Sequence, residues 1–157
     1  MLNTITYLIK NWIYAKLINK FTKYFLLLTV HIDGASRGNP GPSGIGVIIF
    51  RNNTSILNYG EFIGFRTNLL SEYLALKRAL QLAVIIDNEI RVHTDSMTIV
   101  RQRKSKERIR KKELKILSRE INNLEKKFRK ISYEYIPRKR NTSVDLVAKK
   151  AIDYYIN

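Results

Sequence analysis

The chain has 157 residues, 45% of them hydrophobic, so it can build one domain around a single core but not two large domains. Its formal net charge of +16 favours a polyanionic partner, either a nucleic acid or an anionic membrane surface. The absence of cysteine excludes a disulfide framework and a thiolate metal site, which fits a reducing compartment.

Residues 1–24 form a basic and aromatic extension ahead of the domain that we expect at 25–157. Four lysines interrupt its apolar runs well before the roughly 20 residues that a membrane-spanning helix needs, so we expect no transmembrane segment. The order of charged and apolar residues is not that of a secretory signal either. Apolar spacing favours a helix packed on the domain or on a partner. A contact with nucleic acid or a membrane surface and a disordered leader remain alternatives.

The sequence of the first half of the domain predicts three strands followed by a long helix. The three runs, apolar or alternating and joined by short connections, predict an antiparallel meander at residues 26–32, 44–50 and 55–65. Apolar residues at helical spacing then predict an amphipathic helix at 67–86, with Thr67 or Asn68 as its N-cap.

The second half alternates between strands and helices. We expect a strand at 89–94, a helix with its basic residues turned outward at 111–130, a strand at 131–137 and a final helix at 143–155 capped by Ser143. The later strands need crossover connections, whereas the first three do not. The pattern therefore predicts an α/β fold with a mixed five-stranded sheet flanked by helices.

Four carboxylates lie at the ends of these elements: Asp33, Glu72, Asp95 and Asp145. If the first and fourth strands are the central parallel pair, Asp33 and Asp95 leave the sheet side by side at its carboxyl end, where α/β sheets bind ligands. Converging carboxylates repel one another and have raised pKa values, and a hard divalent cation relieves that repulsion. Taken singly, each acid is equally well explained as a turn residue or a helix N-terminal residue.

The residues around these acids occur in a recognisable order. DGASRGNPG at 33–41 is followed by TNLLSEY at 67–73, TDS at 94–96 and IPRKRN at 136–141. Over residues 26–155 the chain resembles the type 1 ribonuclease H family, in the archaeal-type or short bacterial branch that lacks a basic protrusion. The resemblance implies the ribonuclease H-like fold, with the sheet order 3-2-1-4-5 and strand 2 antiparallel.

The same resemblance implies a metal-dependent endoribonuclease that hydrolyses the RNA strand of RNA/DNA hybrids and leaves 5′-phosphate and 3′-hydroxyl ends. Asp33, Glu72, Asp95 and Asp145 fall on the catalytic acids of the family, which hold two Mg²⁺ ions, with Mn²⁺ as a substitute. The nucleic-acid partner would be a hybrid or double-stranded RNA, bound by a cytoplasmic monomer. The alternative is a non-catalytic hybrid- or dsRNA-binding module of the same fold, against which the four retained acids argue.

A second group of residues is expected to contact the substrate: Gly34, Ser36, Asn39, Asn68, Ser96, Arg138, Arg140 and Asn141. The glycines of 33–41 let the backbone turn sharply and approach a phosphate or ribose closely. Leu69 and Met97 stand where the family usually has Asn and Gln, so two polar contacts are missing. Arg138 and Arg140 would assist product release or hold phosphate, with simple surface charge as the alternative.

Most of the excess positive charge lies between residues 101 and 140. The run at 101–112 has few acids at helical spacing, so helix support does not explain it. We expect Arg108, Arg110, Lys111 and Lys112 to hold phosphates of the DNA strand, with a solvated helix face as the alternative.

Two histidines, His31 and His93, each lie two residues before one of the acids and therefore on the same face of their strands. We expect both to support the core or the acids rather than to act as catalysts. Tyr135 stands where many bacterial members carry a mobile histidine.

Overall fold

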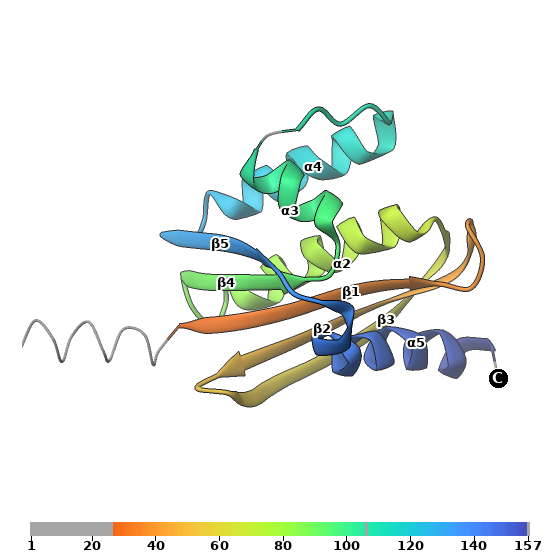
Figure 1. The fold of residues 1–157 in the computed structure, drawn as a ribbon, viewed down its shortest axis with the longest axis horizontal. Helices are drawn as coiled ribbons and strands as arrows, with labels where there is room; N and C mark the ends of the chain where they lie inside the picture. Colours follow the sequence, from red (N-terminus) through yellow and green to blue (C-terminus); the bar gives the residue numbers. More distant parts are fainter. Residues whose placement is uncertain (1–26, 106, 157) are drawn as a thin grey trace, which may run out of the picture.

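The computed structural model describes residues 27–105 and 107–156, so the predicted extension at 1–24 lies outside the described residues. Five strands form one sheet in the order β3-β2-β1-β4-β5, with helices on both faces (Figure 1). Strand β1 pairs antiparallel with β2 and parallel with β4. The predicted fold, sheet order and antiparallel second strand are confirmed. Among the described residues no helix is long and apolar enough to cross a membrane.

The first three strands form the predicted meander, and the last two return in parallel. Their bounds are Leu28–Ser36 for β1, Gly41–Arg51 for β2, Thr54–Arg66 for β3, Glu89–Thr94 for β4 and Lys130–Tyr135 for β5. Asn52 and Asn53, both with positive φ, make the tight turn between β2 and β3. Asparagine tolerates this backbone region better than other residues with a side chain, which explains the asparagine pair at the turn.

The described helices are α2 at Asn68–Ala83, α3 at Met97–Lys104, α4 at Lys112–Glu125 and α5 at Thr142–Ile156, with a 3-10 turn, η1, at Arg138–Arg140. Thr67 caps α2 as predicted, since its Oγ1 accepts a hydrogen bond from the Leu70 amide at 3.4 Å. The predicted cap at Ser143 is wrong. Helix α5 begins one residue earlier because the Asn141 carbonyl already accepts a bond from the Asp145 amide at 3.1 Å.

The main core lies between the sheet and α2, which α4 covers in turn. Figure 1 shows α2, α3 and α4 on one face of the sheet and α5 on the other. Alternate side chains of β1 and β2 enter this core together with one face of α2. Its fully buried members include Val30, Ile32, Val47, Ile49, Tyr73, Leu76 and Leu80. Because α4 buries Leu114, Leu117 and Ile121, its basic residues face outward as predicted.

Helix α5 covers the opposite face and carries one of the predicted acids. Its buried residues lie against glycines of β2, where a side chain would collide. A Cβ atom added at Gly46 would lie 2.9 Å from the amide nitrogen of Ala148. At Gly44 an added Cβ would lie 3.0 Å from Cγ1 of Ile152. The glycines therefore let α5 lie directly on the sheet, and this contact fixes the position of Asp145 at its first turn.

Candidate metal centre and nucleic-acid interface

Strands β1 and β4 pair only as far as His31 and His93, and Asp33 and Asp95 lie two residues further on. The two strands thus separate at the acids, at the carboxyl edge of the sheet where a site was expected. We had predicted that Asp33 ends its strand, and this prediction is wrong. Strand β1 continues to Ser36 because its ladder with β2 extends beyond the end of β4.

Three of the predicted acids meet at this edge. Carboxylate oxygens of Asp33, Glu72 and Asp95 all lie within 4.8 Å of one another. Among the described residues, Glu72 Oε2 is buried without a hydrogen-bond partner. Converging carboxylate oxygens, one of them buried without a donor, fit a hard divalent cation, which prefers oxygen ligands.

Asp145 borders this cluster. Its Oδ2 accepts an ion-paired hydrogen bond from Lys149 Nζ, one turn further along α5, at 2.6 Å. It also lies close enough to Asp33 to influence the ionisation of that residue by charge and by a side-chain hydrogen bond. The structure therefore brings three predicted acids together tightly and places the fourth beside Asp33.

The cluster changes the ionisation of its members. Burial, then the charges of Asp95 and Asp145, raise the pKa of Asp33 from 3.8 to about 7. Burial, followed by the charges of Asp33 and Asp95, also raises the pKa of Glu72 well above its usual value. Without a cation the site therefore retains protons near neutral pH, as the sequence predicted for converging acids.

Of the two arginines predicted in the following loop, Arg138 acts on this cluster. It lies in η1, and its positive charge lowers the pKa of Glu72, opposing the effect of burial. Arg138 and Arg140 are both exposed. The 3-10 turn therefore presents both guanidinium groups to solvent, and that of Arg138 lies close enough to the acids to act on Glu72.

Asn141 follows this turn, and its position corrects a prediction. Its side chain is only 1% exposed, so it cannot contact a bound duplex as we expected. Its Nδ2 donates hydrogen bonds to the Ile32 carbonyl and to Asp95 Oδ1, each at 3.0 Å. Asn141 thus joins β1 and the start of α5 to one acid of the cluster.

The loop after β1 brings together two predicted substrate contacts. Asn39 Oδ1 accepts a hydrogen bond from the Asn68 amide at 3.1 Å, so both residues lie at the start of α2. Ser36 Oγ instead donates to the Arg66 carbonyl at 3.0 Å. Asn39 and Asn68 are therefore neighbours, whereas the Ser36 hydroxyl already has a partner inside the protein.

Ser96 and Gly34 also have structural roles. Ser96 Oγ accepts a hydrogen bond from the Ile99 amide at 3.5 Å and thereby caps α3. Gly34 lies against α2, where an added Cβ would be 2.7 Å from the Ser71 carbonyl oxygen. Close packing on α2 therefore requires a glycine here, and its contact with a substrate stays a prediction.

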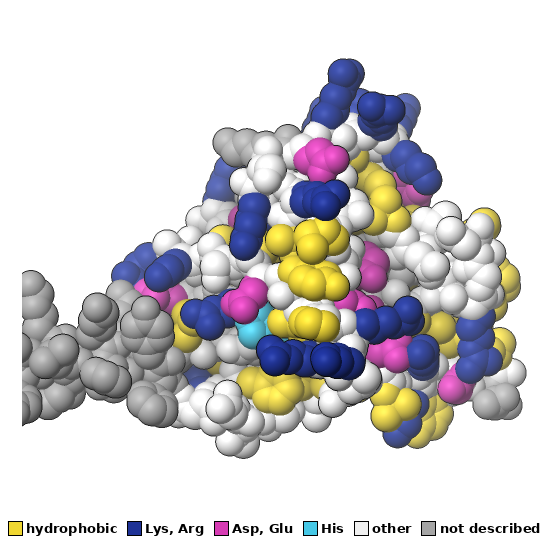
Figure 2. Space-filling model, viewed as in Figure 1, with side chains coloured by type: hydrophobic (Ala, Val, Ile, Leu, Met, Phe, Trp, Pro, Cys, Tyr) yellow, Lys and Arg dark blue, Asp and Glu magenta, His cyan; other side chains and the backbone are white. Residues whose placement is uncertain are grey.

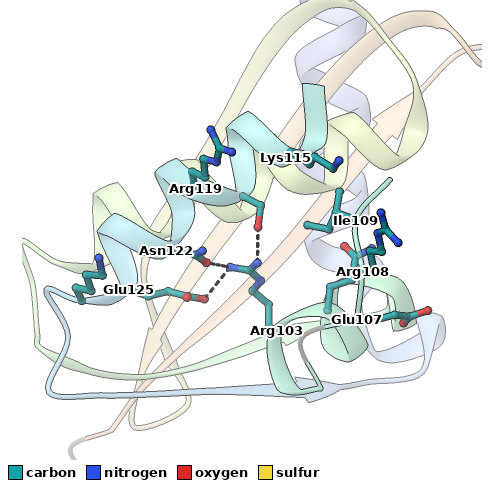
Figure 3. A pocket seen from close by; sticks show the side chains of 11 residues that line it. Arg103, Glu107, Arg108, Ile109, Lys115, Arg119, Asn122 and Glu125 are labelled. Carbon is teal, nitrogen blue, oxygen red and sulfur yellow. Dashed lines mark hydrogen bonds and ion pairs between the residues drawn. The ribbon is translucent and has the colours of Figure 1, made fainter. Parts of the chain in front are cut away.

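Basic side chains gather over α3, α4 and their connection in the upper part of Figure 2. A groove of about 740 Å³ runs between these elements, lined by Arg103, Arg108, Lys115, Arg119, Glu125 and Lys126 among others (Figure 3). Of the predicted phosphate ligands, Arg108 lines the groove. Arg110, Lys111 and Lys112 are exposed on the segment that leads into α4. The sequence did not single out Lys115 and Arg119, although their spacing of four predicts one helix face.

Arg103, within the same basic run, has a different role. Its guanidinium crosses the groove to α4 and donates to Ser118 Oγ at 2.6 Å and to Asn122 Oδ1 at 2.8 Å (Figure 3). It also pairs with Glu125 at 3.4 Å, and its side chain is only 6% exposed. Arg103 therefore holds α3 against α4 and is not free to bind a phosphate.

Comparisons with known proteins agree with this geometry. The family profile described as "Reverse transcriptase-like" matches residues 31–151. The chain is 35% identical to the Bifunctional protein Rv2228c of Mycobacterium tuberculosis over 129 residues, which cover 80% of this chain and 35% of that protein. It therefore spans about a third of the length of the first curated relatives that it matches.

Two solved structures are similar over nearly their whole length. The RNase H1 of Halobacterium salinarum is 30% identical with a TM-score of 0.77, and the match covers 80% of this chain and 97% of that one. LC11-RNase H1, solved in complex with an RNA/DNA hybrid, is 31% identical with a TM-score of 0.79, and the match covers 83% of this chain and 99% of that one. With the matching fold and acid cluster, these likenesses show that the chain belongs to the type 1 ribonuclease H family.

Proposed function

We propose that this chain is a metal-dependent endoribonuclease that hydrolyses the RNA strand of RNA/DNA hybrids. The observation that carries the proposal is the convergence of Asp33, Glu72 and Asp95 at the carboxyl edge of the parallel strands. The hybrid bound by LC11-RNase H1 supports the choice of substrate. Two bound Mg²⁺ ions, with Mn²⁺ as a substitute, would activate water and stabilise the leaving 3′ oxygen, which gives 5′-phosphate and 3′-hydroxyl ends.

The residues of the chain would prepare the site for these cations. Asp33, Glu72, Asp95 and Asp145 would supply the oxygen ligands. Because the pKa of Asp33 is raised to about 7, cation binding near neutral pH would displace a proton from it. The ion pair of Asp145 with Lys149 orients that carboxylate beside Asp33.

The exposed arginines of η1 would act next to the scissile phosphate. Arg138 already interacts with Glu72 through its charge, so a phosphate held over the acids would lie within its reach. Guanidinium groups bind phosphate in bidentate geometry. Arg138, supported by Arg140, would hold the phosphate and assist release of the 5′-phosphate product.

Selection of the substrate would depend on shape. Asn39 and Asn68, adjacent at the start of α2, would meet the minor groove, where an RNA strand displays its 2′-hydroxyl groups. Few base edges would be read, so we expect weak sequence preference. Leu69 is partly buried against the core and cannot replace the polar contact missing at its position.

Arg108, Arg110, Lys111 and Lys112 would hold phosphates of the DNA strand. All four are exposed, and none forms an ion pair with another described residue. Lys115 and Arg119 extend the same basic surface along α4. A monomer in the cytoplasm remains our prediction for the assembly and the location.

The experiment that tests the proposed function is a cleavage assay with a hybrid labelled on its RNA strand. We expect cleavage in Mg²⁺ and none in EDTA, with DNA duplex and single-stranded RNA as control substrates. The new 5′ ends should accept a labelled phosphate only after phosphatase treatment. Binding of hybrid without cleavage in Mg²⁺ or Mn²⁺ would indicate the non-catalytic binding module instead.

A further inference from the structure

A pair of histidines lies beside the metal cluster, and the proposed chemistry uses neither. His31 in β1 and His93 in β4 are directly paired in the parallel ladder. His93 Nδ1 lies 3.2 Å from His31 Nε2, so one ring donates a hydrogen bond to the other. Both side chains are largely buried, and burial is the main cause that lowers the pKa of each ring. At pH 8 the pair is therefore neutral.

Asn141 connects this pair to the metal cluster. Its Nδ2 donates to Asp95 Oδ1, while its Oδ1 is buried and has no hydrogen-bond partner of ordinary geometry among the described residues. The ring of His31 is the neighbour that can satisfy this oxygen. Burial and the charge of His93 lower the pKa of His31 to about 4, but a side-chain hydrogen bond with Asn141 opposes them.

The direction of each hydrogen bond follows from these positions. Since Asn141 Nδ2 donates to Asp95 and to the Ile32 carbonyl, its Oδ1 must act as the acceptor. His31 would then donate from Nδ1 and keep a lone pair on Nε2. His93 would in turn donate from its Nδ1 to that lone pair. One tautomer of each ring satisfies the contacts from His93 to Asp95, and it leaves His93 Nε2 as an acceptor 3.5 Å from Glu134 Oε2.

We propose that His93, His31 and Asn141 form a hydrogen-bonded brace that positions Asp95 as a metal ligand. The inference rests on the proposed carboxylate metal site and assigns to these three a positioning role rather than a catalytic one. Groups that hydrogen-bond a ligating carboxylate fix its orientation, and their loss weakens metal binding. The brace reaches Asp95 from β1, from β4 and from Asn141, the residue before α5.

The competing explanation is that the rings only fill space. His31 packs edge-on against Phe50 with ring centroids 5.0 Å apart, as an aromatic residue without polar function would. His31→Phe separates the two explanations because it keeps an aromatic ring at this site and removes both hydrogen bonds. His31→Gln keeps a donor and an acceptor without the ring.

The first measurement is the tautomer of the rings in the metal-free protein at pH 8, from the nitrogen-15 chemical shifts of the imidazoles. We expect the His31 proton on Nδ1 and the His93 proton on Nδ1. In Asn141→Leu, the proton of His31 should become distributed between both nitrogens. A His31 proton found on Nε2 in the wild type would overturn the brace.

The second measurement is metal affinity, from titration of each folded variant with Mn²⁺ followed by electron paramagnetic resonance. We expect Asn141→Leu and His31→Phe to weaken Mn²⁺ binding by about 10-fold or more. Loss of a group that orients a metal ligand typically lowers metal affinity by at least about this factor. His31→Gln should restore most of the affinity. Thr29→Val, on the same face of β1 but outside the brace, is the matched control and should bind like the wild type.

The outcomes separate this inference from the proposed function. Wild-type affinity in His31→Phe, or equal losses in His31→Phe and His31→Gln, would overturn the positioning role while leaving the metal site intact. Failure of the wild type itself to bind Mn²⁺ would overturn the proposed metal site, and the positioning role with it. The ring tautomers would still decide whether the hydrogen-bonded chain exists.

Discussion

The backbone of Gly34 in β1 touches the backbone that leads into Glu72 in α2. A Cβ atom at Gly34 would lie 2.7 Å from the Ser71 carbonyl oxygen and would also collide with the Glu72 amide nitrogen. The strand and the helix therefore meet where only a hydrogen atom fits. Asp33 precedes Gly34 directly, so this contact sets the separation of the two acids.

Substitution of Gly34 by alanine should therefore disturb both the fold and the site. We expect Gly34→Ala to lower the free energy of unfolding by about 1–3 kcal/mol, as overpacking does, and to weaken Mn²⁺ binding because Asp33 and Glu72 move apart. Urea denaturation and metal titration measure the two effects. Gly60→Ala is the control, because its added Cβ would meet Val147 at 3.1 Å, away from the acids. Equal metal affinity in both variants would contradict the account.

The raised pKa of Asp33 predicts that the metal-free protein loses stability as pH rises. Between 3.8 and about 7, the folded state holds a proton that the unfolded state releases, so the free energy of unfolding falls with pH. Relative to Asp33→Asn, the wild type in EDTA should lose on the order of 2–3 kcal/mol between pH 5 and pH 8. Saturating Mg²⁺ should remove this difference in pH dependence between the wild type and Asp33→Asn. Parallel pH profiles of the two proteins would contradict the shift.

The positions of the acids could be predicted because they depend on local patterns. Runs of apolar residues located β1 and β4, and helical spacing located α2, so Asp33, Asp95 and Glu72 could be assigned to the same edge. The strand ends were less predictable. Asp33 lies inside β1 because pairing with β2 continues to Ser36, and such a long-range ladder leaves no signal near Asp33 itself.

The roles of Asn141 and Arg103 could not be predicted from the sequence. Each appeared in a polar or basic run typical of a binding surface. Asn141 is buried only because β1, β4 and α5 meet around it, and Arg103 only because α4 supplies Ser118, Asn122 and Glu125. Contacts between distant segments decide whether such a residue faces a ligand or the protein.

Arg103 should therefore contribute to stability and not to substrate binding. Arg103→Ala removes a nearly buried cation, takes the ion pair from Glu125 and removes the guanidinium that bonds Ser118. We expect the free energy of unfolding to fall by roughly 3 kcal/mol, as for a broken buried ion pair. Arg101→Ala, an exposed residue on the same helix, should change it little. Similar stabilities of the two variants in thermal unfolding would refute this role.

The exposed basic residues after α3 should instead control the dependence of hybrid binding on salt. Replacing Arg108, Arg110, Lys111 and Lys112 by alanine should flatten the slope of log K against log salt by roughly two to four, since each phosphate contact on a duplex contributes about 0.9. Affinity at low salt should fall, whereas turnover at saturating substrate should change little. Fluorescence anisotropy over a salt series measures the slope.

A control with the same loss of charge distinguishes local contacts from net charge. Alanine at Arg51, Lys127, Lys130 and Lys150, spread over other surfaces, should leave the slope nearly unchanged. Equal slopes in the two quadruple variants would show that the segment from Arg108 to Lys112 is only a solvated surface.

The central claim is that the acid cluster performs metal-dependent cleavage, and Asp33→Asn tests it most directly. The substitution removes one metal ligand and one negative charge near the phosphate. Under saturating Mg²⁺, we expect hybrid cleavage to be abolished and hybrid binding to be retained or slightly tighter, while Asp87→Asn at the opposite end of β4 cleaves like the wild type. If Asp33→Asn retained more than about a tenth of the wild-type rate, its activation barrier would have risen by less than about 1.4 kcal/mol, and the claim would be contradicted.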